Sequence, residues 1–150
     1  MNTTIKNPKV KINPDPITYN PDMVWYSTES LKILRIETNE NYTKIDFVHY
    51  ADRKYLNGGW VRINRNTYIR PVKTDIKLSL IKVINIPVSP ATHYYKSKKD
   101  CLFFTLFFPP LPAGIQKIDI IEESIDRHKR FRFYEVSVVK IRTEALMIKN

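Results

Sequence analysis

The chain has 150 residues, a formal net charge of +10 and 43% hydrophobic residues. This length suits one domain with a substantial core, and the composition is that of a soluble globular protein. No stretch approaches the roughly 20 apolar residues of a membrane helix, the first residues lack the apolar core of a signal peptide, and the single cysteine excludes a disulfide framework. We therefore expect one cytoplasmic domain with no membrane partner.

The net positive charge belongs to the chain beyond residue 30. Residues 1–30 hold three lysines and three acidic residues, so their charges cancel. An excess of this size favours polyanions or acidic protein surfaces as partners. The alternative interpretation is a general richness in Lys, Asn and Ile that has no bearing on function.

Residues 1–27 predict an extended N-terminal arm. Four prolines fall within this segment, at Pro8, Pro14, Pro16 and Pro21. Because proline restricts φ and has no N–H to donate to a sheet, we expect no regular element here. The apolar cluster at 23–26 marks the point where the arm docks.

Residues 31–50 predict an antiparallel pair of strands joined by the polar cluster at 38–41. Apolar and polar residues alternate in both runs, as they do in strands with one buried face. The residues expected to share one face are Leu31, Ile33 and Arg35 in the first run, and Ile45, Phe47 and His49 in the second.

Five further runs read as strands, at 60–69, 76–86, 101–108, 115–122 and 131–141. The most apolar of them, 101–108, predicts a central strand buried on both faces. Asn57-Gly58-Gly59 predicts a sharp turn with positive φ. Residues 123–130 suit either a short helical turn or a charged loop.

Together these runs give about seven strands at the spacing of an all-β, Ig-like antiparallel sandwich. We place the sandwich at residues 28–145, between the arm at 1–27 and a C-terminal tail at 146–150. No helical periodicity lasts for more than two turns.

We expect no enzymatic activity, no cofactor and no metal. The three histidines and one cysteine lack the paired spacing of a zinc site, and no G-x-S-x-G, P-loop or G-x-G-x-x-G motif occurs. Cys101 opens the most apolar strand, where a cysteine is usually a small buried hydrophobe. A catalytic thiol, activated by Lys98 and Lys99, is the alternative.

Asp119, Glu122 and Glu123 form an acidic cluster that suits Mg²⁺ in principle. The simpler interpretation is a set of surface ion pairs with the basic run at 127–130. An enzyme that uses Cys101 or the Asp119/Glu122 pair is our third hypothesis for the function.

Cations interleaved with aromatic residues are typical of surfaces that bind single-stranded nucleic acid. The alternative is that the tyrosines cap the sandwich and the lysines are merely solvated. Sequence alone leaves open whether the cations share one face. The candidate binding residues are Tyr94, Tyr95, Lys96, Lys98 and Lys99; Arg127, Lys129, Arg130 and Arg132; and Arg62 and Arg65.

Three segments carry a resemblance to a known family: GGWVRINRNTYIRP, INIPVSPATHYYKS and FFTLFFPPLPAGIQKIDIIEE. They resemble an Ig-like β-sandwich domain of Bacteroidetes proteins, over roughly residues 30–139. In that family the domain is often a non-catalytic module ahead of a thioredoxin-like domain. Since no Cys-x-x-Cys is present here, the resemblance implies a stand-alone sandwich without the redox context.

Strand alternation places Phe103 and Phe107 on the outward face of run 101–108. Unless another element covers them, they form an exposed apolar patch, and with Trp25 and Tyr26 of the arm they are the candidate interface residues. We expect a protein that binds a protein partner through its arm and basic loops, as an accessory or adaptor subunit of a larger cytosolic assembly. Direct binding of RNA or DNA is the second hypothesis, and no small-molecule substrate is indicated.

Overall fold

The computed structural model describes residues 17–19, 25–26, 30–123 and 131–138. The described residues form twelve strands and no helix: β1 (Ile17–Tyr19), β2 (Trp25–Tyr26), β3 (Leu31–Thr38), β4 (Thr43–Tyr50), β5 (Trp60–Val61), β6 (Tyr68–Pro71), β7 (Leu78–Ser79), β8 (Lys82–Ile84), β9 (His93–Tyr94), β10 (Cys101–Phe108), β11 (Lys117–Ile121) and β12 (Arg132–Ser137). Membrane-spanning helices are thus absent from this part of the chain.

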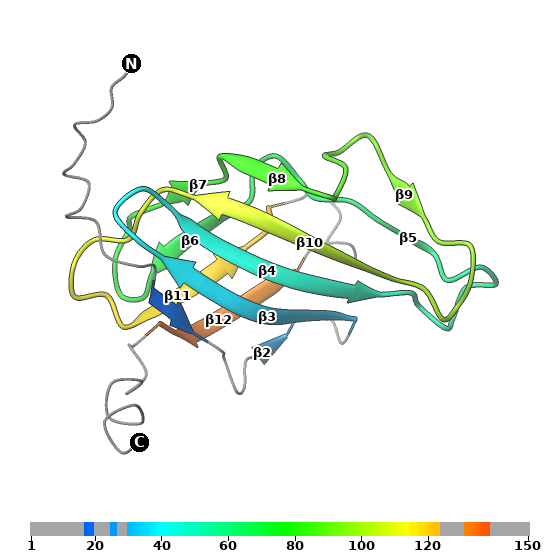
Figure 1. Ribbon diagram of the computed structural model, residues 1–150, viewed down its shortest axis with the longest axis horizontal. Coiled ribbons are helices and arrows are strands. Elements are labelled where there is room, and N and C mark those ends of the chain that lie inside the picture. Colours follow the sequence, from blue (N-terminus) through cyan, green and yellow to red (C-terminus); the bar gives the residue numbers. More distant parts are fainter. Residues whose placement is uncertain (1–16, 20–24, 27–29, 124–130, 139–150) are drawn as a thin grey trace, which may run out of the picture.

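The strands form two five-stranded antiparallel sheets and one short ribbon (Figure 1). The first sheet has the order β1-β3-β4-β10-β8, and the second has the order β2-β12-β11-β6-β7. The ribbon pairs β5 with β9. The two sheets lie face to face as layers, which confirms the expected all-β, sandwich-like architecture.

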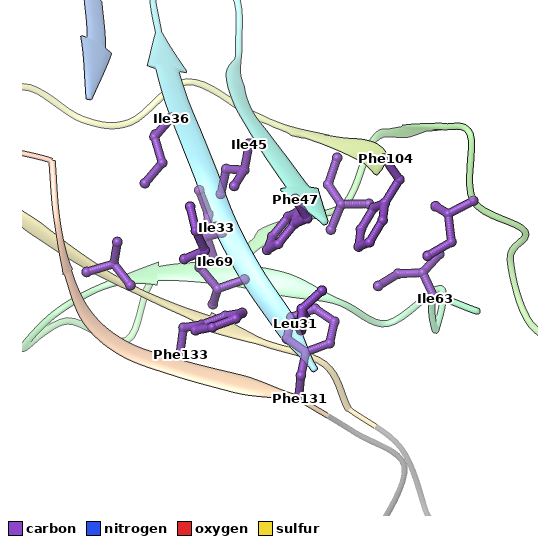
Figure 2. Packing of buried hydrophobic residues seen from close by; sticks show 14 of the residues in the cluster. Leu31, Ile33, Ile36, Ile45, Phe47, Ile63, Ile69, Phe104, Phe131 and Phe133 are labelled. Carbon is purple, nitrogen blue, oxygen red and sulfur yellow. The ribbon is translucent and has the colours of Figure 1, made fainter. Parts of the chain in front are cut away.

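Aliphatic and aromatic side chains together fill the space between the two sheets (Figure 2). Phe47 of β4 stacks on Phe104 of β10, with ring centroids 5.0 Å apart. Its ring also lies 6.0 Å from that of Phe131 and 6.1 Å from that of Phe133, which belong to the opposite layer. These four side chains join the layers, because each is buried.

The predicted β3–β4 hairpin is confirmed. The side-chain oxygen of Asn39 accepts hydrogen bonds from the backbone N–H groups of Asn41 (2.7 Å) and Tyr42 (3.0 Å), which closes the turn. The predicted alternation in β3 is wrong beyond Ile33, because a β-bulge lies between Ile33 and Arg35. The bulge turns Arg35 outward and buries the next residue, Ile36.

The number of strands exceeds the predicted seven, partly because two expected strands are divided. Residues 60–69 supply β5 and β6, which belong to different sheets. Residues 76–86 cross between the layers: the N–H of Leu80 bonds to Thr67 O (3.0 Å), beside the second sheet, and the N–H of Ile81 bonds to Phe107 O (2.8 Å) in the first. β7 and β8 therefore lie on opposite sides of the core.

The arm predicted at 1–27 contributes regular structure, contrary to expectation. β1 pairs with the end of β3, and β2 pairs with β12. The rest of the arm lies outside the described residues. The helical turn or loop expected at 123–130 lies outside them beyond Glu123, and so does the tail at 146–150.

β10 is central, between β4 and β8, but it is buried on one face only. Its inward residues Phe104, Leu106 and Phe108 are buried, whereas Cys101 and Phe103 are exposed. The expected burial of both faces, and of Cys101, is therefore wrong, because no described element covers the outer side of this part of the sheet.

Candidate binding surfaces

The outer face of the first sheet carries an open groove of about 440 Å³. We call it the outer-face groove. Its apolar walls include three exposed side chains, with exposed fractions of 41% for Leu34, 44% for Ile84 and 59% for Phe103. The buried core residues Phe47 and Phe104 also line it. Its polar lining residues are Arg35, Asp46, Asn85 and Thr105.

A row of cross-strand neighbours supplies the polar centre of the groove. Arg35 of β3, Asp46 of β4 and Thr105 of β10 are register partners. Arg35 Nε donates to Asp46 Oδ2 (3.0 Å), and the Thr105 hydroxyl donates to Asp46 Oδ1 (2.7 Å). The terminal nitrogens of Arg35 have no hydrogen-bond partner among the described residues, so they are available to an anionic ligand.

Sequence reasoning missed this polar row, although its register was readable. The hairpin pairs Thr38 with Thr43, and counting back from that pair places Arg35 opposite Asp46. The bulge then adds one residue to β3, so that Leu34 and Arg35 both reach the outer face.

A second surface lies at the end of the sandwich beside the β5–β9 ribbon, which Figure 1 shows projecting from the two layers. Two loops, 52–57 and 96–99, come together here. The N–H of Ala51 bonds to Asp100 O (2.9 Å), and the N–H of Tyr95 bonds to Gly59 O (2.9 Å). Loops that are about forty residues apart in sequence thus form one surface, which we call the basic end.

Five exposed cations occupy the two loops: Arg53, Lys54, Lys96, Lys98 and Lys99. The two neighbouring acids are engaged by backbone groups. Asp52 accepts the N–H of Lys54 (2.9 Å), and Asp100 accepts the N–H of Lys96 (3.0 Å). No ion pair between described residues includes any of the five cations.

The β5–β9 ribbon adds aromatic side chains to the basic end. Trp60 and Tyr94 are register partners, and Tyr94 is 69% exposed. The guanidinium of Arg62 lies over the Trp60 ring, 4.9 Å from its centroid, and donates to Thr92 Oγ1 (3.3 Å) and Pro90 O (3.5 Å). Arg62 thus covers Trp60 and bonds to the 90–92 segment, on the side of the Trp60–Tyr94 pair that faces away from the 96–99 loop.

The other predicted binding residues are not part of the described basic end. Arg65 is exposed in the turn between β5 and β6, and Arg132 is half-buried in β12. Arg127, Lys129 and Arg130 lie outside the described residues, as do the side chains of Trp25 and Tyr26. Only the backbone of the last two is placed, in β2.

Tyr95, predicted as a binding residue, is instead 4% exposed. Its hydroxyl lies 2.8 Å from His49 Nδ1 and donates to His49 O at 3.1 Å, and the two rings are stacked. Burial lowers the pKa of His49 to about 4 against the opposing charge of Asp52. Burial, aided by the charges of Cys101 and Asp100, raises the pKa of Tyr95. Tyr95 therefore packs against His49 directly before the 96–99 loop and does not offer its ring to a ligand.

Two members of the acidic cluster, Asp119 and Glu122, are buried and make structural contacts, whereas the basic run at 127–130 that was expected to pair with the cluster lies outside the described residues. Glu122 is 4% exposed and accepts the N–H groups of Asn64 (2.8 Å) and Phe131 (3.2 Å). Asp119 is also buried; it pairs with Arg70 (3.1 Å) and accepts the N–H of Glu135 (2.9 Å). Each carboxylate therefore ties two chain segments together.

Burial raises the pKa of Glu122 to about 7, against the two backbone hydrogen bonds and the charge of Arg62. Glu123 is exposed. No group of three or more His, Cys, Asp or Glu residues within the described part of the chain is placed to hold a metal ion.

The two predicted interface residues of β10 differ in exposure. Phe103 is exposed in the outer-face groove, as predicted. Phe107 also faces outward but is half-buried, because the Tyr42 ring packs edge-on against it (5.3 Å between centroids) and Lys82 Nζ lies 5.4 Å from its centroid.

Comparison with protein-family models, with curated proteins and with solved structures finds no match to this chain. Function is therefore argued from the two surfaces.

Proposed function

We propose that this chain is a non-catalytic binding module, an accessory or adaptor subunit of a larger assembly, built on an Ig-like sandwich of the kind found in Bacteroidetes proteins. The all-β, two-layer architecture supports the Ig-like assignment. The observation that carries the binding role is the outer-face groove, which exposes apolar side chains on an uncovered part of the first sheet.

The shape of the groove favours a protein partner over a small molecule. Sites for small molecules enclose about 70–90% of their ligand. Leu34, Ile84 and Phe103 are each about half exposed, so the groove covers a ligand from one side only. Such a surface suits an apolar anchor side chain that projects from a larger partner.

The charges around the groove favour an acidic segment as its occupant. Arg35 offers its terminal nitrogens at the centre. Lys32 and Phe103 are both register partners of Val48, on one side of the row formed by Arg35, Asp46 and Thr105. Lys82 is the register partner of Phe107, on the other side of that row. We propose that the partner segment places an apolar side chain on Phe103 and a carboxylate near Arg35.

Site-specific photo-crosslinking in the native cell tests this function. A photoreactive phenylalanine analogue at position 103 or 34 should give the same discrete adduct, and the crosslinked peptide of the partner should contain Asp or Glu next to an apolar residue. Position 134 is the control, because Tyr134 is 40% exposed in β12 of the second sheet and belongs neither to the groove nor to the basic end. Adducts that are absent from 103 and 34, or identical at 134, would contradict the proposal.

A further inference from the structure

The basic end offers a second kind of binding chemistry, beyond the protein-docking function proposed above. We infer that the basic end, made of loops 52–57 and 96–99 with Trp60, Arg62 and Tyr94, binds single-stranded nucleic acid. The lysines and arginines would contact phosphates, and the exposed ring of Tyr94 would stack on a base.

The surface of the basic end is rich in positive charge. Five cations of the two loops are exposed, and both acids beside them, Asp52 and Asp100, accept backbone hydrogen bonds in their own turns. These two carboxylates offset only part of the charge of the five cations. The loops therefore present a local excess of positive charge to an incoming chain of phosphates.

The β5–β9 ribbon adds an aromatic platform, made of Trp60 and Tyr94 with Arg62. Tyr94 is 69% exposed and lies opposite Trp60 in the ribbon, and the guanidinium of Arg62 covers the Trp60 ring. Aromatic rings and guanidinium planes are the groups on which unpaired bases stack. An acidic protein surface would use the cations but has no need of an exposed ring, so the combination favours nucleic acid.

The exposed ring of Tyr94 favours single-stranded over double-stranded nucleic acid. Bases in a duplex are already stacked on one another, so an exposed tyrosine ring on a ribbon reaches only unpaired bases. The platform is also firmly supported. Val61 and His93, the neighbours of Trp60 and Tyr94 in the ribbon, face inward, where His93 packs edge-on against the buried Tyr95 (5.2 Å between centroids).

The test measures the binding of fluorescein-labelled oligothymidine, twelve nucleotides long, by fluorescence anisotropy. We expect binding at low salt that weakens as salt rises, with a logarithmic slope of about −0.7 for each phosphate neutralised. An abasic strand of equal length tests stacking separately from charge. We expect it to bind at least about fivefold more weakly, since each stacked base contributes about 1–3 kcal/mol.

Two sets of variants separate the contributions. Tyr94→Ala should weaken binding of oligothymidine about 5- to 150-fold and leave the abasic strand unaffected, whereas Tyr94→Phe should retain the wild-type affinity. Lys96→Glu, Lys98→Glu and Lys99→Glu together should abolish binding of both strands. The matched control combines Lys73→Glu, Lys77→Glu and Lys117→Glu. This triple variant makes the same change in net charge at exposed lysines outside the basic end. It also removes the Lys117–Glu135 ion pair (3.6 Å) and the contact of Lys77 Nζ with the Tyr68 ring (4.7 Å), so its folding is checked separately.

Three results would overturn the inference. The first is no binding of oligothymidine at low salt. The second is equal binding of oligothymidine, the abasic strand and polyglutamate, which would show a general site for acidic polymers or proteins. The third is an equal loss in the control triple variant, provided that circular dichroism shows all variants to be folded. The photo-crosslinks at positions 103 and 34 are independent of each of these results.

Discussion

At the scale of single residues, the buried Glu122 and the partly buried His49 have pKa values displaced in opposite senses. The pKa of Glu122 rises from 4.5 to about 7, and that of His49 falls from 6.5 to about 4, in both cases mainly through burial. In both residues burial disfavours the charged form. Glu122 is therefore neutral in the folded state below about pH 7, and His49 is neutral above about pH 4.

These displacements give stability contributions of opposite sign. The folded state keeps the Glu122 proton that the unfolded chain loses above pH 4.5, so the free energy of unfolding falls as pH rises from 4.5 to about 7. Below pH 6.5 the unfolded chain binds a proton at His49, whereas the folded state binds it only below about pH 4. The free energy of unfolding therefore rises with pH from about 4 to 6.5. Between pH 4.5 and 6.5 the two contributions largely cancel.

Removing either ionisable group should reveal the pH dependence that the other gives to the free energy of unfolding. Relative to the wild type, the free energy of unfolding of Glu122→Gln should rise with pH between 4.5 and 6.5, and that of His49→Gln should fall, each by up to about 1.4 kcal/mol per pH unit. Glu122→Gln should also be less stable at low pH by about 1–2 kcal/mol, because one backbone N–H loses its acceptor. Urea unfolding at a series of pH values measures both effects, and pH profiles parallel to the wild type would contradict the assignment.

At the scale of elements, the basic end depends on close contact between two loops. Gly58 has φ +93°, and a Cβ at this position would lie 2.6 Å from Ser97 O and 2.7 Å from the Ala51 side chain. Glycine is thus required here for both backbone conformation and space. The Asn57-Gly58-Gly59 pattern predicted the positive φ, and the contact with the 96–99 loop became visible only in the structure.

Alanine substitutions at two glycines should separate conformation from contact. Gly114 has φ +83° but nothing within 4 Å of a Cβ, so Gly114→Ala should cost about 1–2 kcal/mol of unfolding free energy. Gly58→Ala should cost at least about 2 kcal/mol more, because the loops must separate. It should also speed amide hydrogen exchange at Ala51 and Tyr95, whose N–H groups join the loops. Equal costs at both glycines would show that the loops do not depend on this contact.

At the scale of the whole molecule, the two layers are joined through a few large side chains. Phe47 is fully buried and meets Phe104 in its own sheet and Phe131 and Phe133 across the core (Figure 2). Phe103, the neighbour of Phe104 in the same strand, points to the opposite face and is 59% exposed. Neighbouring side chains of β10 thus point into the core and onto the outer face, where docking is proposed.

Truncation of these two phenylalanines should therefore have unequal effects on folding. Phe47→Ala should lower the free energy of unfolding by about 3–5 kcal/mol, since it leaves a cavity between the sheets. Phe103→Ala should change it by less than about 1 kcal/mol, while removing the main apolar wall of the groove. Chemical denaturation of both variants measures the difference, and similar losses would mean that the groove is part of the core.

The sequence by itself predicted the all-β architecture, the β3–β4 hairpin, the inward face of β10 and the turn at Gly58 and Gly59. Alternation of apolar and polar residues determines which face of a strand is buried, and Asn and Gly determine where tight turns form. These are local properties, so they can be read from neighbouring residues. The same alternation correctly placed Phe103 on the outer face.

The tertiary structure alone decided which segments meet. The crossing between layers at Leu80 and Ile81, the bulge that turns Arg35 outward and the burial of Glu122 all depend on partners distant in sequence. So do the junction of loops 52–57 and 96–99, the pairing of Trp60 with Tyr94 and the burial of Tyr95. Contacts of this kind follow from the packing of whole sheets, and no local pattern encodes them.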